Sequence, residues 1–420
     1  MARDLSAPTL SFWSLLALGV NGIVGVGIFF APRDVARLVP GPAGLWVYAL
    51  TALLLLPIAA VYAALGSRFA EDGGPFVWAK AAFGSGAGFL VGWIASVSAV
   101  LSTSAVVSGL ATHAAPLFGV TAPLMRSVFG AGLALVLAVV AASGLRPSAW
   151  VWSGLTLLKL APLVALVLVF LLSSVPAAAP APDAALDPAS ALPRAMLIVV
   201  FALQGFEIVV VPAGNSPGTG RAVAAATLLS LVFVTALYVA LHAACLAVPA
   251  LGEQGAPLVA AAAAHGGGTL QAAVGVATNI SALGIAFGMF AMTPRYLAAL
   301  GTSQGLGDWL GWQSPKRVPT RALWLTTAVV MLLVLGPDLE QLFVLSSVAV
   351  VLQYTVSAAA LVLLAMKRVR GLTRGHLLLG PCALLPVALV ASAASRVELL
   401  ATGGAVVLGA AIWQIRRHFA

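Results

Sequence analysis

The chain has 420 residues, of which 61% are hydrophobic and 8% are charged, and its formal net charge is +9. A soluble globular protein is usually about one quarter charged and under half apolar, so this composition excludes a water-soluble fold. Apolar runs of roughly 18 to 25 residues recur between short polar segments, a pattern typical of helices cut to the thickness of a bilayer. The sequence therefore predicts an all-α integral membrane protein.

Twelve transmembrane helices are expected along the chain. Their predicted ranges are 10–37, 44–66, 85–111, 124–143, 149–172, 193–213, 223–248, 270–298, 320–336, 340–366, 377–394 and 398–415. Residues 1–6 lack the order of a cleavable signal peptide, so the first span is kept as structure. Five longer polar or irregular stretches lie between the spans, at 68–84, 173–192, 212–222, 250–269 and 301–319. None is long enough for an extramembrane domain.

The distribution of Lys and Arg predicts how the chain is oriented. With the N-terminus inside, twelve spans place fourteen of these cations on the cytoplasmic side and five outside. The outer five are Arg33, Arg37, Arg126, Arg194 and Arg396. This asymmetry follows the positive-inside rule and predicts that both termini are cytoplasmic. The basicity is therefore a topology signal, with attraction to membrane lipids secondary and no nucleic-acid partner expected.

Several other functional classes lack their sequence signatures. Cys245 and Cys382 fall inside predicted spans and are expected to be buried apolar thiols rather than disulfide partners. The chain has no Cys/His metal cluster and no G-x-x-x-x-G-K-[ST] phosphate loop. A clustered acid, base and nucleophile set is also missing, so no enzyme activity, metal or cofactor is expected.

Two predicted helices at matching positions carry interruptions. Gly19, Gly22, Gly25 and Gly27 crowd the first span, where each Gly costs about 1 kcal/mol of helix stability relative to Ala. The sixth span has Gln204, Gly205 and Glu207 at its middle and ends on Pro212 and Gly214. Transporters often hold substrate where discontinuous helices of two inverted repeats meet. We expect a first repeat at 10–172, a second at 193–366 and two additional helices at 377–415.

Close packing against a neighbouring helix is the alternative explanation for glycine in a membrane helix. We favour unwinding for the first span, because its glycines cluster as G-x-x-G-x-G before Ile28 and Phe29. Unwound backbone is tolerated in a membrane only where it lines a cavity or meets a ligand. Unpaired N–H groups of Val24 to Gly27 would lie at the start of a half-helix, where the helix dipole favours a carboxylate.

Several motifs resemble the amino acid–polyamine–organocation (APC) family of permeases. The G-V-G-I-F of Gly25 to Phe29 resembles the family's G-S-G-I-F. The R-F-A-E-D-G-G-P-F-V-W-A-K-A-A-F-G of Arg68 to Gly84 resembles its first cytoplasmic loop and is the most specific match. The F-A-L-Q-G-F-E of Phe201 to Glu207, the N-S-P of 215–217 and the K-L-A-P-L of 159–163 are also similar to family patterns. The resemblance implies a LeuT-like five-plus-five inverted repeat with helices 1 and 6 discontinuous.

The resemblance also implies how a substrate is held. Backbone groups of Ile23, Val24, Gly25, Val26 and Gly27 would bind its carboxylate, with no side-chain hydroxyl, because Val26 stands where many relatives have Ser. Carbonyls near three residues of the sixth helix would accept from its ammonium: Phe201, Ala202 and Gly205. Phe201 matches an aromatic lid, with ordinary packing as the alternative. The acidic residue usual before the N-P element is missing, which leaves the gating contacts of that loop open.

Lys159 and Glu207 are the candidate coupling residues. Lys159 is the only Lys inside a predicted span, where a charge costs about 2.5 to 3.5 kcal/mol on insertion scales. Proton-coupled members of the resembling family place a Lys here, where sodium-coupled relatives bind sodium. Lys159 therefore either couples proton movement to transport or makes a fixed structural bond to helix 1. Glu207 is either a gating and protonation site or a hydrogen-bonded acid that stabilises the broken helix.

Other polar residues are weaker candidates. Asn21, Thr278 and Ser281 could line the site, although Ser and Thr in membrane helices often bond to their own backbone. His242 is a lone His in the seventh span and is expected to be a packed polar residue. Arg295 matches a family pattern at the end of the eighth span and is expected to anchor a loop.

The leading hypothesis is a secondary active transporter in the cell membrane that moves an amino acid by alternating access, through proton symport or exchange. A small or neutral substrate is favoured because Val26 is bulky and Glu207 is the only acid near the site, with a cationic amino acid next. The alternatives are a sodium-coupled or polyamine transporter of the same fold and a non-transporting membrane sensor. The oligomeric state is not predicted.

Overall fold

The computed structural model describes residues 11–69, 74–144, 149–178, 188–215, 220–253, 256–303 and 308–419. Within these ranges the chain is helical and contains no strand. The elements are α1 (Phe12–Ile23), α2 (Gly27–Leu38), α3 (Ala43–Gly66), α4 (Pro75–Phe83), α5 (Ser85–Ala114), η1 (Ala115–Phe118), α6 (Pro123–Ala142), α7 (Ala149–Leu172), α8 (Pro188–Leu203), η2 (Phe206–Asn215), α9 (Gly220–Cys245), η3 (Leu251–Glu253), α10 (Pro257–Ser303), α11 (Asp308–Gly311), α12 (Thr320–Leu335), α13 (Leu339–Met366), η4 (Val369–Gly371), η5 (Arg374–Leu378), α14 (Leu379–Cys382), α15 (Leu385–Ala393) and α16 (Arg396–Phe419).

Among the described residues, eight helices are long and apolar enough to cross a membrane, and the bent pair α1 and α2 makes a ninth. Three shorter apolar segments, 156–172, 320–335 and 374–389, fall where the remaining spans are expected. Outward-facing Leu172, Leu332 and Leu400 are 88%, 70% and 76% exposed, as side chains that meet lipid would be. The protein is therefore a multi-pass membrane protein, and the count of twelve spans stays a prediction.

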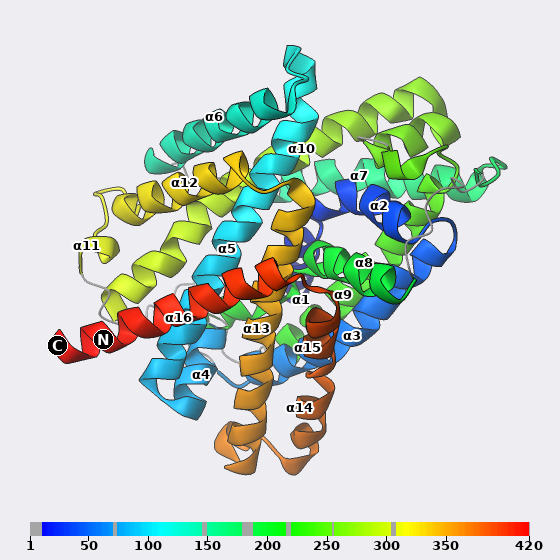
Figure 1. The fold of residues 1–420 in the computed structure, drawn as a ribbon. Coiled ribbons are helices and arrows are strands. Elements are labelled where there is room, and N and C mark those ends of the chain that lie inside the picture. The colour runs from blue at the N-terminus through cyan, green and yellow to red at the C-terminus, as the bar shows by residue number, and fades with distance from the viewer. Residues whose placement is uncertain are drawn as a thin grey trace.

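The interrupted elements lie at the centre of the bundle (Figure 1). α1 packs against α9 and η2, whereas α2 packs against α8. α3, α5, α9, α10 and α13 surround them, and α6 and α12 pack together at one edge. α16 runs along the outside of α5 and α13. Both halves of each broken helix are thus enclosed by protein, where irregular backbone is tolerated in a bilayer.

Several stretches expected to be irregular are helical instead. The cytoplasmic-loop motif contains α4, which starts at Pro75, a residue suited to the first turn because its missing N–H would be unpaired there. The stretch 250–269 contains the first turns of α10, whose run of Ala residues favours helix, with a break at Gly267, where φ is 66°. α8 begins at Pro188, inside the stretch 173–192, and α11 lies inside 301–319. These stretches are therefore partly helical rather than irregular throughout.

Two further expectations need correction. Cys245 is buried as expected, but Cys382 is exposed. The expected span 377–394 is divided between η5, α14 and α15, in a segment that contains Pro381 and Pro386. Proline removes a helix donor and clashes with the preceding turn, which accounts for the divided span. Predictions for residues 1–10, 70–73, 145–148, 179–187 and 216–217 lie outside the described ranges.

Candidate functional site

The first helix is broken at the expected place. α1 ends at Ile23, α2 begins at Gly27, and the two helices are bent by 47°. Gly25 lies in the break, whereas Gly19, Gly22 and Gly27 lie in helix and pack closely. A side-chain carbon on Gly19 would lie 2.6 Å from the Ser230 hydroxyl, and one on Gly27 would lie 2.7 Å from the backbone of Ala202. Both explanations for the glycines therefore hold, each at different positions.

The amide of Val24 differs from its prediction. Its N–H donates to the carbonyl of Val20 at 2.9 Å, because the last turn of α1 extends one residue beyond the helix. Val24 is therefore not an open donor for a carboxylate, and its carbonyl is the group that faces another helix. The side chain of Val26 packs against Gly109 of α5, where a side-chain carbon would lie 2.8 Å from it.

Lys159 of α7 lies against the end of α1. Its side chain is buried, with 3% of the residue exposed. The ammonium donates to the carbonyl of Val24 at 2.6 Å and to that of Asn21 at 3.0 Å. The hydroxyl of Tyr238 donates to the carbonyl of Ile23 at 3.0 Å. The carboxyl end of a helix carries partial negative charge, so a cation is stabilised at this position.

The second interruption lies between α8 and η2, at Gln204 and Gly205. Gly205 has a φ of 121°, which side-chain-bearing residues rarely adopt, and it lies directly against the backbone of Gly22 and Ile23. The second interruption therefore touches the last turn of α1, directly before the break of the first helix. The carbonyl of Gly205 accepts from the amide of Ile208 at 3.1 Å, so it is not wholly released as expected and keeps one lone pair for another donor.

The end of α8 contacts two other helices, through Phe201 and Ala202. The ring of Phe201 stacks on that of Phe343 from α13, with centroids 4.3 Å apart and an interplanar angle of 24°. Ala202 packs against Gly27 of α2. Stacking on Phe343 suits both a lid and ordinary packing, so the two interpretations of Phe201 stay open. The contact with Gly27 brings the two sets of predicted backbone residues together.

Glu207 bonds to the interruption itself. Its carboxylate accepts from the amide of Gly205 at 2.9 Å and from the hydroxyl of Tyr354 at 3.2 Å. The ring of Tyr354 contacts that of Tyr62 edge-on, with centroids 5.6 Å apart. Trp78, from the cytoplasmic-loop motif, contacts Tyr62 in the same way. A buried aromatic cluster thus connects Glu207 to α4.

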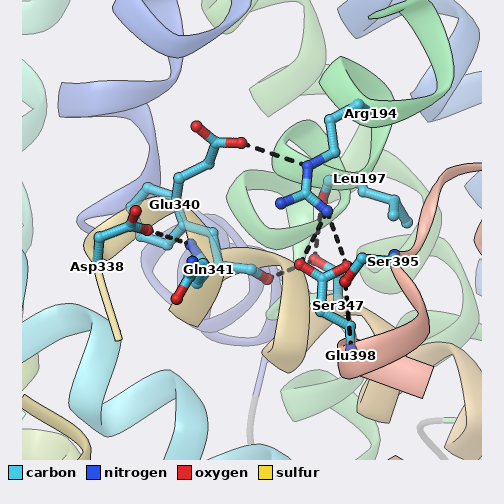
Figure 2. Close-up of polar contacts among 9 residues, drawn as sticks. Arg194, Leu197, Asp338, Glu340, Gln341, Ser347, Ser395 and Glu398 are labelled. Atoms are coloured by element: carbon cyan, nitrogen blue, oxygen red, sulfur yellow. Dashed lines mark hydrogen bonds and ion pairs between the residues drawn. The ribbon is translucent and has the colours of Figure 1, made fainter. Parts of the chain in front are cut away.

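Ion pairs join the ends of α2, α8, α13 and α16 on the side expected to be external. Figure 2 shows the pairs that Arg194 makes with Glu340 and Glu398. Arg194 of α8 contacts both carboxylate oxygens of Glu398 from α16 at 2.8 Å. It also reaches Glu340 of α13 at 3.3 Å, and Glu340 lies 3.7 Å from Arg37 of α2. The outer halves of both broken helices are therefore tied to α13, and α8 is tied to α16 as well.

The remaining sequence candidates have separate places. Thr278 bonds to the carbonyl of Val274 in its own helix, as its alternative predicted. Ser281 is buried and has no hydrogen-bond partner among the described residues. Arg295 bonds to the carbonyl of Ala291 in its own helix. Tyr238 and Tyr354 went unnoticed because no motif marks them, and only the folded chain shows what their hydroxyls bond. In the described ranges no group of three His, Cys, Asp or Glu side chains gathers.

Broken helices that meet inside a multi-pass bundle are an arrangement typical of membrane transport proteins. Residues 10–404 match the amino acid permease family, and the chain belongs to that family. It is 26% identical over 393 residues to an arginine/ornithine antiporter of Pseudomonas aeruginosa, covering 86% of this chain and 80% of the relative. It is 26% identical to an uncharacterized transporter of Mycobacterium tuberculosis, covering 97% and 91%. Human cationic amino acid transporter 4 is 24% identical, over 55% of this chain and 39% of the relative.

Proposed function

We propose that this permease is a secondary active transporter that moves an amino acid across the cell membrane by alternating access, coupled to protons by symport or exchange. In this proposal the twelve spans form a LeuT-like five-plus-five repeat, with both termini cytoplasmic. The observation that carries the proposal is the contact between the two broken helices at Gly22 and Gly205, with Lys159 bonded to the end of α1.

The substrate is bound by backbone at this contact. Amides at the start of α2, around Gly25 to Gly27, meet the carboxylate, because the N-terminal end of a helix favours an anion. Carbonyls at the end of α8, around Phe201 and Ala202, accept from the ammonium. The packing of Gly27 against Ala202 supports this, because it brings donors and acceptors close enough for one small molecule to reach both.

Proton coupling is assigned to Lys159. The carbonyls of Asn21 and Val24 would suit a metal cation, but an ammonium already lies against both. A sodium ion there would be repelled by the positive charge of Lys159, which argues against sodium coupling. Loss of a proton from Lys159 would weaken its bonds to α1 and let the two halves of the first helix move relative to each other.

A small neutral amino acid is the favoured substrate, with a cationic amino acid or a polyamine next. The only acid at the interruptions is Glu207, and its carboxylate already accepts two hydrogen bonds. Exchange of cationic amino acids is the second candidate, because relatives of this chain are named as an arginine/ornithine antiporter and cationic amino acid transporters.

Thermal melting of the purified protein with amino acids and amines tests the substrate. A ligand that binds only the folded state raises the melting temperature by mass action. We expect alanine or another small neutral amino acid to give the largest rise, whereas a larger rise with arginine or ornithine would favour the second candidate.

Uptake into proteoliposomes then separates a transporter from a sensor, since binding without any uptake or exchange would contradict transport.

A further inference from the structure

A group of buried polar atoms between α3 and α9 lies outside the site described above. His242 of α9 and Tyr48 of α3 are both 0% exposed, and their rings lie 5.2 Å apart. Among the described residues, the two ring nitrogens of His242 have no hydrogen-bond partner, and the hydroxyl of Tyr48 has none either. More than nine in ten buried polar groups in proteins are hydrogen-bonded, so two adjacent exceptions call for a shared ligand.

Gly44 shapes the space around His242. A side-chain carbon on Gly44 would lie 2.5 Å from the Nε2 atom of His242 and 3.2 Å from the carbonyl oxygen of Val39. Only glycine therefore leaves room for this imidazole. Gly44 follows Pro42 and Ala43, which are exposed at the end of the molecule expected to be external. His242 is thus close to the outer surface although it is buried.

From His242 a line of polar groups leads inward to Lys159. Tyr48 is one helical turn below Gly44, and Tyr238 is one turn below His242. The rings of Tyr48 and Tyr238 lie 6.5 Å apart, edge to face. The hydroxyl of Tyr238 donates to the carbonyl of Ile23, and Lys159 donates to that of the next residue, Val24.

Among the described residues, the titratable groups near His242 include His265 of α10, whose Nε2 atom lies 2.9 Å from the carbonyl oxygen of Ala244. Cys245 lies on the same helix as His242 and donates to the carbonyl of Pro257. Asp34 of α2 pairs with Arg33, while its second carboxylate oxygen has no partner among the described residues.

We propose that His242 and Tyr48 form a hydrated proton-transfer site that carries protons between the outer surface and Lys159. Water is the ligand that can bond at once to an imidazole and a phenol, and buried water typically makes about three hydrogen bonds. A proton from outside binds to one nitrogen of His242 as the other nitrogen gives its proton to water. The water passes a proton to the Tyr48 hydroxyl, which gives up its own proton toward Tyr238, and Lys159, when it is a neutral amine, takes up the proton that arrives at the inner end. This inference rests on the proton coupling proposed for Lys159.

The test uses the full-length protein in proteoliposomes and alanine and arginine as probes. For each variant, uptake driven by a pH gradient is divided by exchange measured without a gradient. We expect Tyr48→Phe and His242→Phe to lower this ratio by about 100-fold, the low end of the effect of losing a positioned proton-transfer group. Since the Tyr48 hydroxyl has no partner within the described ranges, Tyr48→Phe is expected to fold, and His242→Gln provides a second variant with polar atoms.

Thr326→Val is the matched control, because Thr326 also has a buried hydroxyl without a partner among the described residues but lies on α12. Its ratio should equal that of the unaltered protein. An unchanged ratio in Tyr48→Phe and His242→Phe, or an equal fall in Thr326→Val, would overturn the inference while leaving proton coupling intact. Exchange without any gradient-driven uptake in the unaltered protein would instead overturn proton coupling and this inference together.

Discussion

The ammonium of Lys159 lies 2.6 Å from the carbonyl oxygen of Val24, the residue that follows the last turn of α1. The same ammonium bonds to Asn21, so one buried cation bonds to two carbonyls at the carboxyl end of a broken helix. A helix end attracts a cation, and a charge buried in a membrane needs such a partner. The geometry makes the conformation of the first helix sensitive to the charge on Lys159.

The first prediction concerns this charge. Lys159→Gln keeps a donor for one carbonyl but removes the charge and the titrating proton. We expect the variant to fold and exchange substrate but to lose accumulation driven by a pH gradient, measured in proteoliposomes. Lys80→Gln is the control, because Lys80 is exposed on α4, and it should still accumulate substrate. Gradient-driven accumulation by Lys159→Gln would refute the coupling role.

The second prediction separates the two roles of Glu207. Gln at this position still offers a carbonyl oxygen to the amide of Gly205 and the hydroxyl of Tyr354. The free energy of unfolding should therefore change by about 1 kcal/mol or less. If Glu207 gates by protonation, the pH dependence of uptake should flatten in Glu207→Gln, and this is the result we expect. A normal pH profile would assign Glu207 the structural role alone. Tyr354→Phe, which removes one donor but no charge, should keep the pH profile.

Much of the fold was predictable because the bilayer restricts what a sequence can do. Long apolar runs give helices, and glycine clusters mark where a helix is weak. The break around Gly25 and the interruption at Gly205 follow from these local rules. By contrast, α4 was missed because nine residues are too short to show a membrane pattern, and their helix is stabilised by contacts such as that between Trp78 and Tyr62.

Candidate site residues can be named from the sequence, but their contacts cannot. The sequence marks Lys159 as a buried charge, yet only folding selects the carbonyls of Asn21 and Val24 as its partners. The glycines show the same limit, because close packing at Gly19 depends on Ser230, which lies more than 200 residues away. Contacts between distant segments set these details, and a local pattern contains no information on them.

The third prediction concerns the contact between Gly205 and the last turn of α1. Gly205→Ala should destabilise the protein, since its φ of 121° disfavours any side chain and the added carbon would overlap the backbone of Gly22. The strained backbone alone costs about 1 to 3 kcal/mol, and the overlap adds to this. Gly132→Ala is the control, since nothing lies within 4 Å of the added carbon, and it should stabilise α6 by up to about 1 kcal/mol. Equal melting temperatures for the two variants would contradict the contact.

The fourth prediction concerns the ion pair between Arg194 and Glu398. Removing one partner of a buried pair leaves the other charge uncompensated, which costs about 3 to 5 kcal/mol. The side chain of Arg194 is 21% exposed and also reaches Glu340. For Glu398→Gln we therefore expect a smaller loss in the free energy of unfolding, about 2 kcal/mol by the same reasoning. Thermal melting measures the loss, and the exposed Glu253 provides the control as Glu253→Gln.

Replacing both Arg194 and Glu398 shows whether their ion pair stabilises the fold or only compensates the charge of each buried side chain. Apolar replacement of a whole buried pair is often neutral or stabilising, so Arg194→Met with Glu398→Leu should melt closer to the unaltered protein than either single variant. If the pair also holds α8 against α16 during transport, the double variant should exchange substrate at a different rate although its stability is restored. Additive losses of stability would mean that the two side chains act independently, contrary to their contacts at 2.8 Å.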